Sequence, residues 1–181
     1  RGESRFVQGN YGGRLSSWGD TIYLLNDQGA AVAATNYPAS LSSQQRYLRI
    51  SEIMYHPPSP PGGPYLKDDF EFIELVNTHT EAISIAGSTL TDGIYATLDG
   101  ELEPGECVVL VRNLSAFASR YTTNAMRIGG VYSGGLENSG EPIQLDDNRN
   151  EIIHAFRYDD AWYPATDGGG SSLEANDLYA P

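Results

Sequence analysis

Residues 143–158 read IQLDDNRNEIIHAFRY, a pattern that is typical of a β-hairpin. Two apolar runs, Ile143–Leu145 and Glu151–Tyr158, flank a turn at 147–150 that reads Asp-Asn-Arg-Asn. The last turn residue, Asn150, tolerates the positive φ that a type I turn with a bulge requires. The stretch therefore predicts two antiparallel strands joined by a tight turn.

The same pattern occurs a second time, 121 residues earlier in the chain. Val7–Tyr37 aligns without a gap with Ile128–Tyr158, and Gly29 takes the slot of Asn150. Self-similarity at a fixed offset indicates a repeated structural unit. The identical pairs are Gly9/Gly130, Tyr11/Tyr132, Gly13/Gly134, Leu15/Leu136, Gly19/Gly140, Ile22/Ile143, Leu24/Leu145, Ala34/Ala155 and Tyr37/Tyr158.

Short apolar runs broken by Gly, Pro, Asn and Asp recur along the chain, and long helical periodicity is absent. This pattern predicts an all-β sandwich or barrel. One short helix is predicted at about 114–121, capped by Asn113, because Leu114, Phe117 and Tyr121 fall on one helical face. The strands predicted besides Ile143–Leu145 and Glu151–Tyr158 are Ile22–Leu25, Ala30–Tyr37, Leu48–Tyr55, Glu71–Asn77 and Cys107–Val111.

The composition limits the classes of partner. The 181 residues include 24 Asp and Glu against 11 Lys and Arg, a formal net charge of −13. This balance disfavours a nucleic acid or an anionic membrane as the partner. No apolar run approaches the roughly 20 residues that span a bilayer. The single cysteine, Cys107, excludes a disulfide within the chain, and its strand-like surroundings predict a buried position.

An ordered series of motifs spans residues 48–174. It comprises Ile50–Tyr55, Glu71–Asn77, Ile83–Gly93, Leu102–Gly105, Tyr132–Glu141, Tyr158–Asp160 with Trp162 and Pro164, and Gly170–Glu174. The order and spacing of these motifs resemble the lamin tail domain, in the form that recurs in secreted multidomain proteins.

The resemblance implies an immunoglobulin-like β-sandwich over residues 47–177 and a non-catalytic binding or architectural module. An exported multidomain parent with a protein or cell-surface partner is the expected setting, outside the cell or at its surface. Residues 1–37 then resemble the C-terminal hairpin of a preceding lamin-tail-like repeat, and residues 38–46 a linker. The start at Arg1, without Met, fits a cut inside a tandem array. Because a lone hairpin is marginally stable, residues 1–37 are expected to pack on the sandwich or to mediate self-association.

Two alternative binding functions depend on other side chains. Trp162 and Tyr163 would form a platform for a sugar in a carbohydrate-binding module. Asp159, Asp160 and Asp92 lie in predicted loops, where oxygen ligands would hold Ca²⁺ in an adhesion module. Apart from that Ca²⁺, no cofactor and no metal site are expected.

A third alternative is an enzyme that uses Glu52 and Glu74 as an acid/base pair. Both glutamates stand in apolar runs. Glu74 alternates in phase with Phe72, and Glu52 with Leu48 and Ile50. The non-catalytic interpretation is that they bond to backbone groups or tyrosine hydroxyls, or face solvent past a bulge. The histidines lack metal-ligand spacing and no nucleophile elbow is present, so no catalytic residues are expected.

Overall fold

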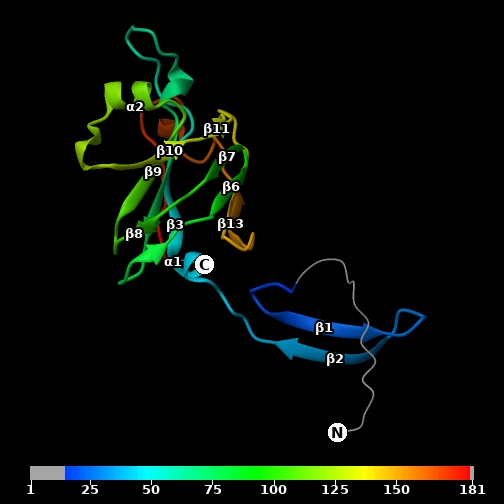
Figure 1. The fold of residues 1–181 in the computed structure, drawn as a ribbon. Coiled ribbons are helices and arrows are strands. Elements are labelled where there is room, and N and C mark those ends of the chain that lie inside the picture. Colours follow the sequence, from blue (N-terminus) through cyan, green and yellow to red (C-terminus); the bar gives the residue numbers. More distant parts are fainter. Residues whose placement is uncertain (1–14, 180–181) are drawn as a thin grey trace. The chain divides into compact units, whose positions relative to one another are not determined.

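The computed structural model describes residues 15–179 and divides the chain into two compact units, Arg1–Ser40 and Leu41–Pro181 (Figure 1). The repeat pairs that involve Gly9, Tyr11 and Gly13 therefore lie outside the described residues.

The first unit is an antiparallel hairpin. Strand β1 (Asp20–Leu25) pairs with β2 (Ala31–Tyr37), and the register shifts once, near the turn. The side chain of Asn26 closes the turn, because its Oδ1 accepts the N–H groups of Gln28 and Ala30 at 3.0 and 2.8 Å. Both predicted strands of this unit are confirmed.

The second unit is a sandwich of two five-stranded sheets, as predicted, which face each other in Figure 1. The first sheet runs, in spatial order, β10 (Arg127–Val131), β9 (Cys107–Val111), β4 (Phe72–Asn77), β3 (Leu48–Met54) and β14 (Leu173–Glu174). The second runs β11 (Ser133–Gly134), β7 (Ile94–Thr97), β6 (Thr89–Asp92), β12 (Pro142–Asp146) and β13 (Ile152–Arg157). A separate short pair joins β5 (Ile83–Ser84) to β8 (Glu101–Leu102).

The main core fills the space between the two sheets. Alternate residues of each strand point inward, so Ile73 and Leu75 of β4 meet Ile143 and Leu145 of β12 in one cluster. All four side chains are at most 1% exposed. Burial of each such side chain contributes about 1.5–3 kcal/mol, which makes this cluster the main source of stability.

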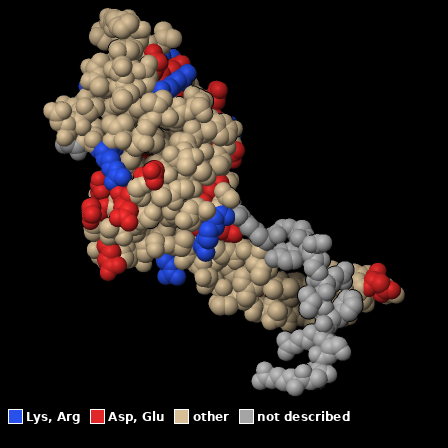
Figure 2. Space-filling view, in the orientation of Figure 1, with Lys and Arg blue, Asp and Glu red and all other residues tan. Residues whose placement is uncertain are grey.

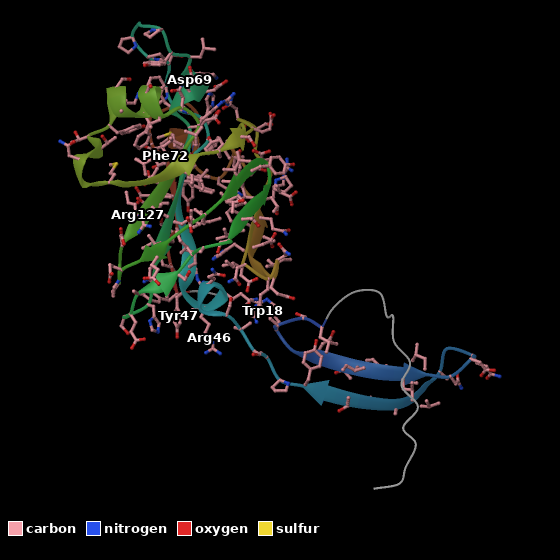
Figure 3. All side chains as sticks on the ribbon, in the orientation of Figure 1. Trp18, Arg46, Tyr47, Asp69, Phe72 and Arg127 are labelled. Carbon is pink, nitrogen blue, oxygen red and sulfur yellow. The ribbon has the colours of Figure 1, made fainter. Side chains whose placement is uncertain are left out.

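A smaller apolar cluster covers the outer face of the first sheet. Helix α2 (Leu114–Arg120) begins at Asn113, whose Oδ1 accepts two N–H groups of its first turn, and Phe117 packs edge-on against Phe72 at 5.5 Å. Figure 3 shows Phe72 on the sheet below this helix. The predicted helix and its cap are confirmed. Strand β4 is buried on both faces because α2 covers its outer side.

Helix α1 (Ser43–Tyr47) occupies part of the segment that the sequence placed in a linker. Ser42 begins it with a capping box to Gln45 and donates a hydrogen bond to Asp147 Oδ2 at 2.7 Å. The amide of Gln44 donates to the main-chain oxygens of Ser84, the last residue of β5, and of Ala86, and it accepts the Asn148 N–H. These contacts tie residues 42–47 to the sandwich, so only the start of the expected linker 38–46 precedes the second unit.

A buried carboxylate, Glu71, joins the two sheets. It is 1% exposed, and its oxygens accept hydrogen bonds from Arg112 (2.7 Å), the Tyr132 hydroxyl (3.2 Å) and the Leu136 N–H (2.9 Å). Burial is the largest influence and raises the pKa of Glu71 to about 7, although these donors oppose it.

The two hairpins have the same backbone. β12 pairs with β13 in the register of β1 with β2, offset by 121 residues, and the shift falls at the matching place. Asp147 Oδ1 accepts the N–H groups of Arg149 and Glu151, as Asn26 does in the first hairpin. Gly29 and Asn150 both adopt positive φ, 78° and 56°, as the predicted turn type requires. The hairpin predicted at residues 143–158 is confirmed.

Candidate functional site

A cavity of about 550 Å³ opens between an edge of each sheet of the second unit. One wall is β3 with β14 and the residues that follow it, and the other is β13 with the loop after it. We call this cavity the edge cleft. Because β13 and β14 each end the order of a sheet, strands that could accept a further neighbour border the cleft.

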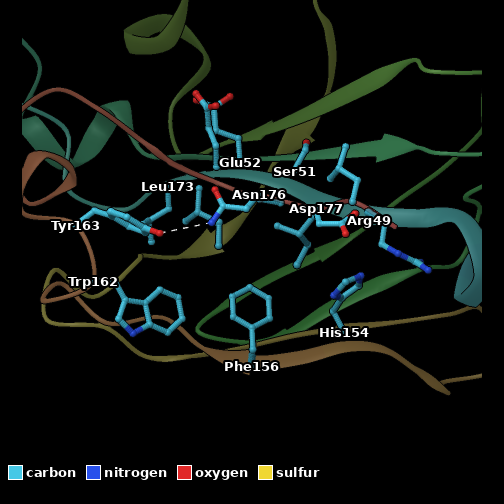
Figure 4. A pocket seen from close by; sticks show the side chains of 15 residues that line it. Arg49, Ser51, Glu52, His154, Phe156, Trp162, Tyr163, Leu173, Asn176 and Asp177 are labelled. Carbon is cyan, nitrogen blue, oxygen red and sulfur yellow. Dashed lines mark hydrogen bonds between the residues drawn. The ribbon is translucent and has the colours of Figure 1, made fainter. Parts of the chain in front are cut away.

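Apolar side chains line the interior of the edge cleft. Phe156 pairs across the hairpin with buried Ile143, so its ring points inward rather than to solvent. On the opposite wall, Leu173 of β14 and Ile53 of β3 are cross-strand partners, and both line the cleft. Figure 4 shows Phe156, Trp162 and His154 on one side of the cleft, directed toward the segment that carries Leu173.

Two exposed aromatic residues form the rim. Trp162 and Tyr163 are each 52% exposed. The Asp159 carbonyl accepts the Trp162 N–H at 3.2 Å, and its side chain accepts the Ala161 N–H at 2.9 Å, so a turn fixes the tryptophan. The Tyr163 hydroxyl accepts a bond from Asn176 on the opposite wall at 3.5 Å. The two predicted binding aromatics therefore share one site.

His154 supplies a polar group inside this apolar cleft. Its Nε2 atom is buried and has no hydrogen-bond partner among the described residues. Burial, followed by the charge of Arg49, lowers the pKa of His154 to about 4, so the ring is neutral at pH 7. A buried polar atom without a partner costs about 1–3 kcal/mol, and a ligand in the cleft would relieve that cost. The matching residue of the first hairpin is Ala33, so the hairpin itself does not require an imidazole there.

The three candidate aspartates do not form one cluster. Asp159 fixes the turn before Trp162, and Asp160 follows it. Asp92 ends β6, where it pairs with Gln144, and does not line the edge cleft. In residues 15–179 no group of three or more His, Cys, Asp and Glu side chains is placed to hold a metal ion.

Glu52 and Glu74 lie side by side on the outer face of the first sheet. They are cross-strand partners, because the register of β3 shifts between Ile50 and Glu52. The expectation that Glu52 is in phase with Leu48 and Ile50 is therefore wrong: the bulge turns Glu52 to the opposite face. Figure 4 shows its carboxylate pointing away from Phe156 and Trp162.

The expected bulge is present before Glu52, but serine hydroxyls, rather than backbone or tyrosine donors, bond to both glutamates. Ser172 donates to Glu52 and Ser51 donates to Glu74 at 2.7 Å. Burial raises the pKa of Glu52, and the charge of Glu74 adds to that effect. Cys107 is partly buried beside them, and burial raises the pKa of its thiol to about 11, so the thiolate is not favoured at pH 7.

Sequence reasoning found Trp162 and Tyr163 but missed the interior of their site. The sequence predicts a strand that contains Phe156 and His154, but it does not predict which of its side chains point inward. The bulge near the turn of β12–β13 decides this. Asn176 lies beyond the last predicted strand, and its approach to Tyr163 depends on tertiary packing. The alternation of Phe156 with Arg157 was the one available signal.

The surface charge is mixed on the visible face. Figure 2 shows acidic side chains gathered near β8, with Lys and Arg scattered among uncharged residues. Within the described part of the chain, the helices are all too short or too polar to span a membrane.

Comparison with known protein families gives a match to the second unit. The sequence model of the Lamin Tail Domain family matches residues 42–160, which include the sandwich up to the loop after β13. A comparison with curated proteins finds no match. The family is an immunoglobulin-like, generally non-catalytic module involved in protein interactions, and the two packed sheets agree with that fold. Since the family model covers well over half of the 181 residues, the chain belongs to the lamin tail domain family.

Proposed function

We propose that this chain is a non-catalytic protein-binding module of an exported multidomain protein, and that the edge cleft captures an extended, apolar peptide segment of a protein or cell-surface partner. The observation that carries the proposal is the cleft itself: apolar inside, aromatic at the rim, and bordered by edge strands of both sheets. The exported setting is supported by the resemblance of the motifs to the secreted form of the family.

The chemistry of the cleft favours a peptide. An extended segment beside β13 would add main-chain hydrogen bonds to a sheet edge while its alternate side chains enter the cleft. Phe156 and Leu173 offer an apolar pocket for one such side chain. The unpartnered Nε2 of His154 offers a neutral polar contact to a main-chain amide or carbonyl. Trp and Tyr side chains commonly carry much of the binding energy of such interfaces.

A carbohydrate ligand is the second candidate, and one observation favours it. Trp162 and Tyr163 are adjacent, half-exposed and on the same rim, as a sugar-stacking platform requires. The apolar interior behind them favours a peptide side chain over a hydroxylated ring.

The test uses the fluorescence of Trp162. The chain contains two tryptophans, so Trp18→Phe leaves Trp162 as the sole reporter. In this background, capped eight-residue peptides with a central Leu, Phe or Trp and a panel of soluble oligosaccharides are titrated. We expect a saturable response to at least one apolar peptide, and binding weakened ten-fold or more by Phe156→Ala, read by calorimetry.

The control is Tyr95→Ala, which removes an aromatic side chain that is 58% exposed and lies outside the cleft. It should leave peptide binding unchanged. Saturable binding of oligosaccharides alone would replace the peptide with a sugar, and equal losses in Phe156→Ala and Tyr95→Ala would refute the cleft as the site.

A further inference from the structure

We propose that the hairpin β1–β2 is the closing hairpin of a second lamin-tail sandwich. The face of β1 that carries Ile22 and Leu24 is then a docking surface. The segment that occupies it is the front of that second domain, by which we mean the strands equivalent to β3 through β11. This surface is separate from the edge cleft, so either proposal can fail alone.

The backbone agreement extends beyond the strands. Gly19 N–H donates to Ser16 O as Gly140 N–H donates to Glu137 O, again at an offset of 121 residues. Both glycines have positive φ, 78° and 90°. A Cβ on Gly19 would lie 2.9 Å from Tyr37 O, and one on Gly140 would lie 2.2 Å from the matching oxygen. The first hairpin thus keeps a close approach that only glycine permits.

The two inward side chains of the first strand are the same in both copies, although Thr35 takes the place of the inward Phe156 on the second strand. The surroundings of these side chains differ. Ile143 and Leu145 are 1% and 0% exposed in the core of the sandwich. Their identical counterparts Ile22 and Leu24 are 42% and 64% exposed. An apolar strand face on a two-stranded sheet is unstable in water unless something covers it.

The second hairpin shows what covers such a face. β12 lies between β13 and β6, with Leu145 paired to Leu90, and its inward side chains meet Ile73 and Leu75 of β4. In the described part of the chain, β1 pairs with β2 and with no other strand. The missing neighbours are therefore a strand equivalent to β6 along the edge of β1 and a sheet equivalent to β3–β4 over its face.

A second copy of this chain is not a suitable occupant. The place next to its β6 is already filled by its own β12, which is covalently attached and fully packed. An occupant must carry a lamin-tail front whose β6-type edge is free. In the second unit that front precedes the hairpin in sequence, so the same topology places the occupant before β1 in the parent polypeptide.

The inference is tested by a hairpin exchange in the full chain. Residues 136–158 are replaced by the sequence of residues 15–37, which the gapless alignment makes possible without altering loop lengths. We expect the exchanged chain to retain a cooperative urea transition and slow hydrogen exchange at the Leu90 amide of β6. Its midpoint should fall, because Thr replaces the inward Phe156 and Asn replaces Asp147 beside Ser42.

Two matched variants of the exchanged chain decide the meaning of the result. Ile22→Asp with Leu24→Asp places charges on the inward face and should abolish the transition, whereas Thr21→Asp on the outer face should preserve it. A second exchange keeps Asp147, Arg149 and Phe156. It separates the loss of the turn contacts and of the Phe156 ring from a failure of the Ile22–Leu24 face. Failure of both exchanges to fold cooperatively overturns the proposal.

The oligomeric state of the unaltered chain tests the other occupant. Sedimentation equilibrium should show no dimer that depends on Leu24. A specific dimer that Leu24→Asp dissociates would identify a second copy as the occupant and would also overturn the proposal.

Discussion

The hairpins β1–β2 and β12–β13 have the same register, the same turn hydrogen bonds and the same two inward side chains on the first strand. One forms the first unit, where Ile22 and Leu24 are 42% and 64% exposed, and the other is an integral part of a sandwich of two five-stranded sheets. The local sequence is therefore sufficient for hairpin geometry, whereas burial and stability come from strands that are distant in sequence.

The largest contrast is expected at the inward leucines. Leu145→Ala should lower the free energy of unfolding of the sandwich by about 3–5 kcal/mol, because it leaves a cavity in the core. Leu24→Ala should change that transition by less than about 0.5 kcal/mol. Urea unfolding of the two variants measures both values, and similar losses would show that the first hairpin is also part of the cooperative core.

The glycines that open each hairpin should give the next largest effect. Gly140→Ala forces a side chain into a positive-φ position against the Tyr158 carbonyl and should destabilise the sandwich by about 2–3 kcal/mol. Gly19→Ala meets a similar clash but should weaken only the protection of the β1–β2 amides. Hydrogen exchange with mass spectrometry separates the two. A global effect of Gly19→Ala would contradict the independence of the hairpins.

The buried carboxylate of Glu71 should set a pH dependence. Glu71 has a folded pKa of about 7 against an ordinary value of 4.5, so the folded state binds its proton more tightly than the unfolded chain does. Its stabilising contribution is complete below pH 4.5 and is lost as the pH rises through 7. The free energy of unfolding of the protein should decline by on the order of 1–2 kcal/mol between pH 5 and 8 through this effect, and Glu71→Gln should reduce the decline.

Urea midpoints at pH 5, 6, 7 and 8 measure the decline for the protein and for Glu71→Gln. The exposed Glu101→Gln serves as the control and should keep the decline of the parent. If Glu71→Gln declines as steeply as the parent, Glu71 does not cause the pH dependence.

The smallest effect is expected in the turns. Asn150 holds a φ of 56° where the first hairpin has Gly29. Asn150→Gly should change the stability of the sandwich by less than about 0.5 kcal/mol, because both residue types tolerate this conformation. Asn150→Ala should cost about 1 kcal/mol. Thermal unfolding compares the two variants, and equal costs would mean that the side chain of Asn150, rather than its φ, stabilises the turn.

Much of the fold follows from local features of the sequence. Runs such as Cys107–Val111 combine apolar residues with clear turn signals on either side, and the helix after Asn113 has both a cap and an amphipathic face. Strands of two residues, such as β5 and β14, could not be predicted because they show no periodicity. Their pairing depends entirely on the strands already in place.

The candidate site divides in the same way. The exposed aromatics Trp162 and Tyr163 stood out by residue type alone. The pairing of Glu52 with Glu74 did not, because the bulge at Ser51 inverts the alternation that a regular strand would have. A one-residue bulge is a tertiary feature whose sequence signal is weak, yet it decides which side chains reach a cleft.

The sequence alone is enough to place two hairpins and their turns, because these depend on neighbours within about 20 residues. The identical pairs at an offset of 121 residues relate the two hairpins to each other. Tertiary contacts decide that one of them is buried, that Glu71 is enclosed among its donors, and that Phe156 and His154 face a cleft. The physical reason is that burial and face are properties of contacts between distant strands. Two segments with the same local pattern thereby reach different environments.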